Sequence, residues 1–193
     1  MAKGLMDRII DSIFDEYQLQ LPDKSVLQKK LQELINMPLL KMEKSMVREA
    51  EQRDLDAILE LYLFLHEDSI PEKDEHLRDT WLQIIQDPNH HLIVNEVDGK
   101  IVSSCVCVII PNLTRNIRPY AFVENVVTRE DYRGKGYAGE CLEFAREIAE
   151  KENCYKMMLL TGSKKPETLH FYEKAGYNSS DKTAFIQWLG MDK

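Results

Sequence analysis

Residues 132–138 read Tyr-Arg-Gly-Lys-Gly-Tyr-Ala, and this short stretch decides the fold. Its two glycines allow the backbone to bend tightly and to turn successive N–H groups inward. The apolar residues of 137–151 recur at helical spacing, so we expect a helix whose positive dipole end faces the loop. Arg133 and Lys135 add formal charge. The loop therefore predicts binding of a phosphate or pyrophosphate group.

Other phosphate-binding loops fit this stretch less well. A Walker loop requires Gly-x-x-x-x-Gly-Lys-Ser/Thr, which the sequence lacks. The dinucleotide pattern Gly-x-Gly-x-x-Gly is formally complete at Gly134, Gly136 and Gly139. However, the loop follows antiparallel-type strands and opens no repeated βαβ halves, and no acidic residue closes a following strand at the required distance. A plain glycine turn is the remaining alternative.

Hydrophobic periodicity predicts alternating strands and helices around this loop. We expect strands at residues 46–50, 91–96, 101–110, 120–128, 156–161 and 183–189, and helices at 55–66, 75–86, 137–151 and 167–174. Asp98-Gly99 predicts a tight hairpin between the second and third strands. Asp54 is suited to cap the first of these helices, and residues 111–119 are expected to form a loop.

A second motif lies downstream, where residues 171–177 read Phe-Tyr-Glu-Lys-Ala-Gly-Tyr. This motif and the Arg-x-x-Gly-x-Ala pattern of residues 133–138 together resemble two signatures of the GNAT N-acetyltransferase superfamily, in the family's order and at its spacing. The resemblance implies an α/β (α+β) fold with a mixed, mostly antiparallel central sheet flanked by helices. It covers the domain expected at residues 46–193 and leaves residues 1–45 outside.

Residues 1–45 are expected to form a helical N-terminal appendage. Two amphipathic stripes, at residues 4–17 and 25–35, predict two helices separated by Pro22-Asp23. An appendage of this size is too small to be stable alone, so it must pack on the main domain, on a second subunit or on a partner. A homodimer is one arrangement that these helices allow.

The composition excludes several classes of protein. The chain has 193 residues and a formal net charge of -8, which disfavours nonspecific binding to nucleic acid or to anionic membranes. It lacks an apolar run of the length that a membrane span needs and a signal-peptide core. The four cysteines have no ligand-type spacing and are expected to be buried free thiols, without a metal. We therefore expect a cytoplasmic protein.

The resemblance also implies a cofactor and the residues that hold it. Acetyl-CoA would be the acyl donor, and its pyrophosphate would lie in the loop formed by Arg133, Gly134, Lys135, Gly136, Tyr137 and Ala138, with Gly139 in the first helical turn. Its pantetheine arm would pair with the preceding strand, locally splayed by a bulge, at Val126, Val127 and Thr128. The N–H group of Val126 would polarise the thioester carbonyl.

Two side chains are candidates for proton transfer. An acceptor amine must lose a proton before it can attack, and Glu124 is the candidate general base. A regular strand would place Glu124 on the same face as Val126 and Thr128. Tyr172 matches the family's general-acid tyrosine and would protonate the departing thiolate. A carboxylate exposed to solvent and a tyrosine that only packs are the respective alternatives.

The acceptor site is suggested by the uneven distribution of charge. Residues 49–79 hold 11 acidic and three basic side chains, which gives a net charge of -8 within that segment. Five of these acidic side chains would attract a cationic amine, although a solvated acidic face is an equally simple interpretation. They are Glu67, Asp68, Glu72, Asp74 and Glu75. Arg115 and Arg118 are suited to a carboxylate, so an acceptor with both groups would fit.

We therefore expect acetyl transfer to the amine of a small molecule. A protein N-acetyltransferase and a CoA-binding regulatory or interaction module, which would dock through the N-terminal helices, are the alternatives.

Overall fold

The computed structural model describes residues 23, 25–30, 45–65 and 67–189. The chain divides into two compact units, Met1–Glu43 and Lys44–Lys193. In the first unit, residues 25–30 are helical, within the second of the two expected N-terminal helices. The other expected helix, at residues 4–17, lies outside the described residues.

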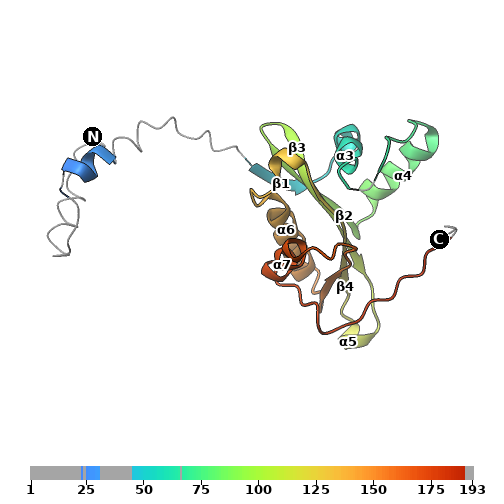
Figure 1. Ribbon diagram of the computed structural model, residues 1–193. Coiled ribbons are helices and arrows are strands. Elements are labelled where there is room, and N and C mark those ends of the chain that lie inside the picture. Colours follow the sequence, from blue (N-terminus) through green and yellow to red (C-terminus); the bar gives the residue numbers. More distant parts are fainter. Residues whose placement is uncertain (1–22, 24, 31–44, 66, 190–193) are drawn as a thin grey trace. The chain divides into compact units, whose positions relative to one another are not determined.

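The second unit is built on a five-stranded sheet in the order β1-β2-β3-β4-β5 (Figure 1). Its strands are β1 (Ser45–Glu49), β2 (His90–Val97), β3 (Lys100–Ile110), β4 (Tyr120–Thr128) and β5 (Met157–Leu159). The first four strands pair antiparallel, and β5 pairs parallel to β4. The expected mixed, mostly antiparallel sheet is confirmed.

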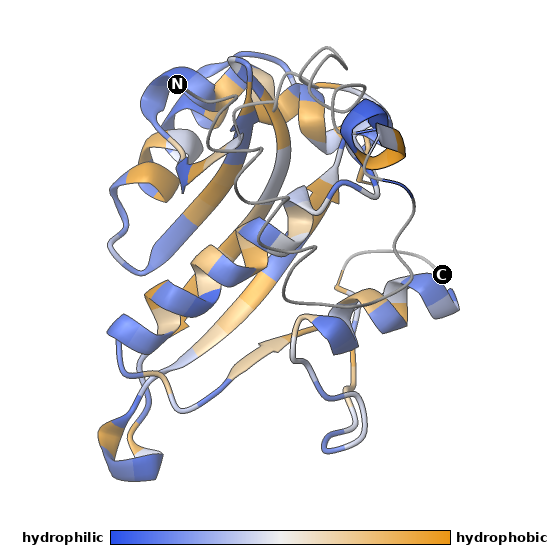
Figure 2. Cartoon of the chain, turned by 90° about the vertical axis from the view of Figure 1, so that its left-hand side faces the viewer, coloured by the Kyte–Doolittle hydropathy of each residue, from blue (hydrophilic) through white to orange (hydrophobic). Residues whose placement is uncertain are grey.

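Helices cover both faces of this sheet. They are η1 (Gln52–Asp54), α3 (Leu55–Tyr62), α4 (Glu75–Gln86), α5 (Thr114–Ile117), η2 (Glu130–Tyr132), α6 (Tyr137–Lys151) and α7 (Pro166–Lys174). On one face, Ile58 and Leu61 of α3 and Trp81 of α4 form a buried apolar cluster with β2 and β3. On the other face, α6 crosses the sheet (Figure 2), and α7 packs beside it. The amphipathic stripes of these helices thus become the two cores of the domain.

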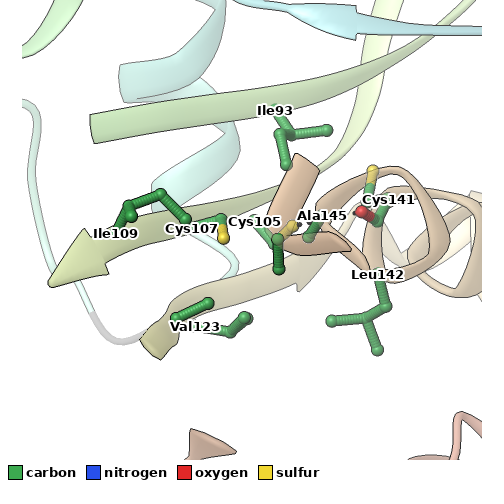
Figure 3. Close-up of a cluster of buried hydrophobic side chains, with 10 residues drawn as sticks. Ile93, Cys105, Cys107, Ile109, Val123, Cys141, Leu142 and Ala145 are labelled. Atoms are coloured by element: carbon green, nitrogen blue, oxygen red, sulfur yellow. Dashed lines mark hydrogen bonds between the residues drawn. The ribbon is translucent and has the colours of Figure 1, made fainter. Parts of the chain in front are cut away.

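Three of the four cysteines lie in the core beneath α6 (Figure 3). Cys105 and Cys107 of β3 and Cys141 of α6 are fully buried, and the Cys105 thiol donates a hydrogen bond to the Cys141 carbonyl at 3.5 Å. Burial raises the pKa of Cys107 to about 12, so this thiol is protonated and unreactive at neutral pH. The prediction of buried free thiols is confirmed for these three residues. Cys154 is also free but half-buried.

The expected hairpin is present, because Asp98 and Gly99 both adopt positive φ angles between β2 and β3. Asp54 precedes α3 as expected, but its side chain does not cap the helix. Its carboxylate is instead paired with the Arg48 guanidinium at 2.6 Å and accepts the Glu51 N–H at 2.7 Å. The Asp54 carboxylate therefore pairs with the largely buried guanidinium of Arg48 in β1 and not with the N–H groups of α3.

One further expectation about secondary structure is refined and one is wrong. The loop expected at residues 111–119 contains a short turn, α5, in which Arg115 and Asn116 adopt left-handed backbone angles. The expected last strand at residues 183–189 is not formed. This segment extends away from the sheet (Figure 1), and no strand in the described part of the chain pairs with its backbone.

Candidate active site

A bulge interrupts β4 at the middle of the sheet. Ser104 pairs with Val127 and Val106 pairs with Glu124, so two residues of β4 lie opposite the single residue between Ser104 and Val106 of β3. The first of the two, Asn125, has a φ angle of 52° in the left-handed region. Such bulges are common beside active sites because they redirect the backbone and its side chains. The bulge expected before the glycine loop is therefore present.

The bulge changes which side chains share a face. Glu124 lies opposite Val106, whose side chain packs in the cluster beneath α3 and α4, whereas Val126 packs in the cluster beneath α6 and α7. The expectation that Glu124, Val126 and Thr128 share a face is therefore wrong. The extra residue shifts the two-residue alternation by one position, which moves Glu124 to the α3 side.

The sheet also opens beside this bulge. The parallel pairing of β4 with β5 covers only Ala121, Phe122 and Val123. Beyond Val123, β4 keeps β3 as its neighbour, and no described residue forms a ladder with its other edge. The peptide groups of residues 124–127 on that edge are therefore available to an extended ligand, whereas the Thr128 carbonyl accepts a hydrogen bond from Arg133.

Glu124 lies at the start of this opening. Burial raises the pKa of its carboxyl, and a hydrogen bond with the Asn125 backbone partly opposes this effect. A raised pKa makes a carboxylate a stronger base, which suits the acceptance of a proton.

Tyr172 of α7 approaches the same region from the opposite face. Its ring lies 5.0 Å from that of Phe171 and 6.2 Å from that of Tyr177, which holds it in an aromatic group. Burial raises the pKa of the Tyr172 phenol, with additional contributions from Cys105 and Glu124. The phenol therefore stays protonated at neutral pH. Tyr172 lies on the α6 side of the sheet, whereas the side chain of Glu124 lies on the α3 side.

The glycine loop lies at the end of β4 and leads into α6. Gly134 and Gly136 have φ angles of 75° and 95°, and a Cβ atom at either would meet nothing within 4 Å. Gly139 lies in the first turn of α6, as expected. The open, left-handed glycines and the helix start form a cradle of the kind that binds phosphate.

Cations surround this cradle. The Lys135 and Lys100 ammonium groups lie 4.9 and 5.4 Å from the centre of the Tyr132 ring. The Arg133 side chain is 54% exposed, and its guanidinium donates to the Thr128 carbonyl at 3.2 Å and lies 3.5 Å from Glu130. The positive charge of Arg133 is therefore accessible from solvent.

A hollow of about 530 Å³ lies between β1 and the start of α6, and Gly136 and Gly139 form part of its lining. The rest of the lining includes three carboxylates, which would repel a phosphate: Glu140, Glu143 and Glu147. Neither Glu124 nor Tyr172 lines it. We therefore place the site at the opening beside β4 and not in this hollow.

The structure does not bring the four expected acceptor-binding residues together. Glu67 and Asp68 are exposed in the connection between α3 and α4. Arg118 donates to the carbonyls of Asn153 and Cys154 at 3.0 and 2.9 Å, and Arg115 lies over the Tyr155 ring. These arginines thus pack against the turn after α6, at the end of the domain opposite the α3–α4 connection (Figure 1).

One polar group at the bulge was not predicted from the sequence. The hydroxyl of Tyr62, at the end of α3, is buried and has no hydrogen-bond partner among the described residues, and the same is true of the Ser104 hydroxyl. Burial raises the pKa of Tyr62 to about 12, and the nearby Ser104 and Asn125 side chains partly oppose this effect. In the sequence, Tyr62 is one more member of an apolar helical stripe, so no signal distinguished it from a core residue.

A mostly antiparallel sheet that opens at a bulge, with a glycine loop at the end of the open strand, defines the class of α/β fold to which this chain belongs. The model of the acetyltransferase (GNAT) family matches residues 55–177, and the chain belongs to this family. Among the described residues, no helix has the length and apolarity of a membrane span.

Solved structures show the same fold. A putative acetyltransferase from Agrobacterium tumefaciens is 37% identical, with a TM-score of 0.69 over 74% of this chain and 99% of that one. Glucosamine-6-phosphate N-acetyltransferase from Arabidopsis thaliana is 26% identical, with a TM-score of 0.67 over 77% of this chain and all of that one.

A curated relative matches over a shorter stretch. Glucosamine 6-phosphate N-acetyltransferase of Trypanosoma brucei brucei is 34% identical over 84 residues. These cover 44% of this chain, which spans about half (55%) of the relative's length.

Proposed function

We propose that this protein transfers an acetyl group from acetyl-CoA to the amine of a small molecule by direct attack on the thioester. The observation that carries the proposal is the open edge of β4 at the bulge, which lies between Glu124 and the glycine loop. A β4 that paired with β5 along its whole length would leave no edge for the donor.

The residues present fit the donor. The loop from Arg133 to Ala138 would hold the pyrophosphate on its N–H groups, and Gly139 allows close approach at the first turn of α6. The open edge at Val126, Val127 and Thr128 would pair with the amide groups of the pantetheine arm. Bound acetyl-CoA supplies an activated thioester, whose carbonyl would accept a hydrogen bond from the Val126 N–H.

Glu124 and Tyr172 would then move the protons. A free amine has a pKa of about 10, so most of it is protonated at neutral pH and cannot attack. Glu124 would accept that proton, directly or through water, and its raised pKa suits this role. Tyr172 would donate its phenolic proton to the sulfur as the carbon–sulfur bond breaks, because its raised pKa keeps the phenol protonated.

For the acceptor, we propose an amine that carries an acidic group, such as an amino-sugar phosphate. The name of the trypanosomal relative, a glucosamine 6-phosphate N-acetyltransferase, supports this class. Glu67 and Asp68 lie on the α3 side of the sheet, as Glu124 does, and would attract the ammonium group. We leave Arg115 and Arg118 out of this site, because their guanidinium groups already contact the turn after α6.

A thiol-release assay with a panel of acceptors tests the proposal. Glucosamine 6-phosphate, amino acids, polyamines and aminoglycosides would each be supplied with acetyl-CoA. We expect turnover with a phosphorylated amino sugar and little with the polyamines. Turnover only with polyamines would refute the acceptor class, and turnover with no amine would refute the proposed function.

A further inference from the structure

Two buried hydroxyl groups beside the β4 bulge have no hydrogen-bond partner in the described part of the chain. They belong to Tyr62, at the end of α3, and to Ser104 of β3, which is 0% exposed. A buried polar group without a partner destabilises a fold, so its presence in a native protein calls for an explanation. The steps proposed for acetyl transfer use neither hydroxyl, although Ser104 is only two residues along β3 from the pairing partner of Glu124.

The side chain of Asn125 lies next to these hydroxyls. Burial raises the pKa of the Tyr62 phenol to about 12, and the side chains of Ser104 and Asn125 oppose this effect, so both lie near the phenolic oxygen. Asn125 itself is exposed. Its side chain therefore connects the buried hydroxyls with the surface of the domain.

The bulge turns Asn125 to the same face of the sheet as the candidate base. Glu124 lies on the α3 side because it is opposite Val106, and Val126 lies on the α6 side. Asn125 adjoins Tyr62 of α3, so it shares the α3 side with Glu124. Consecutive residues of a regular strand point to opposite faces, and the bulge, with its left-handed φ of 52° at Asn125, breaks this rule. Two polar side chains therefore lie side by side where the acceptor would bind.

The chemistry of the amide indicates what Asn125 can bind. An amide carries no charge, and it both donates and accepts hydrogen bonds, as a hydroxyl does. An ammonium group only donates, so the Glu124 carboxylate suits it better. The Cα atoms of consecutive residues are about 3.8 Å apart, so Glu124 and Asn125 would contact groups on neighbouring atoms of one ligand. The pair thus suits an amine with a hydroxyl on the next carbon atom.

We propose that the Asn125 amide binds an acceptor hydroxyl on the carbon atom next to the amine-bearing carbon, and that the Tyr62 and Ser104 hydroxyls hold this amide in position. This role rests on the proposed function, because it concerns the acceptor of the same site. Tyr62 and Ser104 are positioning residues, which fix the direction that the amide faces. Proteins tolerate such a loss of stability where a polar group serves binding. A site built to pair with a hydroxyl discriminates against an acceptor that lacks it, because the site's polar groups are then left unpaired.

Acceptors that differ by one hydroxyl test the proposal with the full chain. Glucosamine 6-phosphate carries a hydroxyl on each carbon next to its amine-bearing carbon, and the 1-deoxy and 3-deoxy analogues each lack one of the two. We expect the wild type to lose at least about tenfold in kcat/KM with one of these analogues. Equal kcat/KM values for all three acceptors, or turnover confined to amines without such a hydroxyl, would overturn this inference and leave acetyl transfer intact. A chain that turns over no amine would refute the proposed function and this inference with it.

Asn125→Gly is the most informative variant, because glycine keeps the left-handed backbone of the bulge while the amide is removed. This variant should turn over glucosamine 6-phosphate no faster than the analogue that the wild type discriminates against, and its kcat/KM for that analogue should equal the wild-type value. A purely structural role would instead lower kcat/KM for both acceptors alike. Such a parallel loss, or discrimination that persists at the wild-type level, would contradict the proposal.

Tyr62→Phe and Ser104→Ala test the positioning residues, and Tyr155→Phe is the matched control. Tyr155 lies in the turn after α6, where its ring contacts Arg115. Each of the first two variants should reduce the discrimination between acceptors several-fold, without a loss of stability and with an unchanged kcat/KM for the analogue. The control should change none of these values. Wild-type discrimination in both Tyr62→Phe and Ser104→Ala would show that the buried hydroxyls do not position the amide.

Discussion

Replacement of Arg48 by alanine should destabilise the domain strongly, because this guanidinium neutralises two carboxylates. It pairs with Asp54 at 2.6 Å and with Glu96 at 2.7 Å. The three side chains are exposed by only 15%, 7% and 24%, respectively. Without Arg48, Asp54 would retain the Glu51 N–H but lose its buried counter-ion.

The magnitude follows from this burial. Removal of one partner of a buried ion pair costs about 3–5 kcal/mol. The partial exposure of Glu96 gives its charge some access to water, so we expect a loss of about 2–4 kcal/mol. For a domain of this size, 1 kcal/mol corresponds to about 2–4 °C, so the melting temperature should fall by roughly 4–16 °C.

Chemical unfolding in urea at pH 7 is the appropriate assay, and Arg53→Ala is the matched control. Arg53 also lies beside Asp54, but at 4.0 Å and with 68% exposure, so its removal should change the stability by less than about 0.5 kcal/mol. If both substitutions lowered the free energy of unfolding equally, the reasoning would be refuted, because burial would then not determine how much the ion pair stabilises the domain.

The pH dependence provides a second check. Burial alone would raise the pKa of Asp54, but its bonds with Arg48 and Glu51 outweigh this and lower the pKa below its usual value. The stabilisation from this lowered pKa is therefore complete above the unfolded value of about 3.9 and is lost as the pH falls through the folded value. The difference in the free energy of unfolding between wild type and Arg48→Ala should therefore become smaller below about pH 4. A difference that stays constant down to pH 2 would contradict the assignment.

Three further predictions concern the candidate site. Glu124→Gln should lower kcat about 100-fold. It should also abolish the fall in activity at acid pH that protonation of Glu124 causes in the wild type, and a variant that keeps this fall would show that another group is the base. Tyr172→Phe should lower kcat by at least about tenfold with little change in the KM for acetyl-CoA, as steady-state kinetics would measure, and unchanged turnover would remove Tyr172 from the mechanism. Tyr62→Phe removes a buried, unpaired hydroxyl, so thermal unfolding should show a stability unchanged or raised by about 1 kcal/mol, whereas a loss above about 1 kcal/mol would indicate a satisfied hydrogen bond.

Much of the fold followed from local patterns in the sequence. The Asp98-Gly99 hairpin and the α6 stripe are encoded by turn residues and by periodicity, which act over a few neighbouring positions. The glycine loop was likewise recognisable from the sequence, because positions with left-handed backbone angles favour glycine in any fold.

The errors came from longer-range interactions. Asp54 was expected to cap a helix, but an arginine on β1 pairs with it. Residues 183–189 were expected to form a strand, but a strand forms only where it can pair with the edge of a sheet. The local sequence carries no information about whether such an edge lies within reach.

The bulge explains why the site itself was only partly predicted. The presence of the bulge was expected from the family resemblance. However, the side of the sheet on which Glu124 lies was predicted wrongly, because one inserted residue reverses the alternation of side chains. Tyr62 and Ser104 come from distant parts of the chain and meet only once α3 packs on the sheet. Their proximity is a property of the tertiary structure, for which one sequence carries no local signal.

The most direct test of the proposed activity is a count of acetyl groups by mass spectrometry. The protein would be incubated with acetyl-CoA labelled with ¹³C in the acetyl group and with glucosamine 6-phosphate, and both products would be quantified. We predict one labelled N-acetyl group on the amine for each free CoA formed, with both products strongly reduced in Glu124→Gln. Tight binding of acetyl-CoA without a labelled amine would contradict the proposal and would favour a module that binds CoA but does not transfer its acyl group.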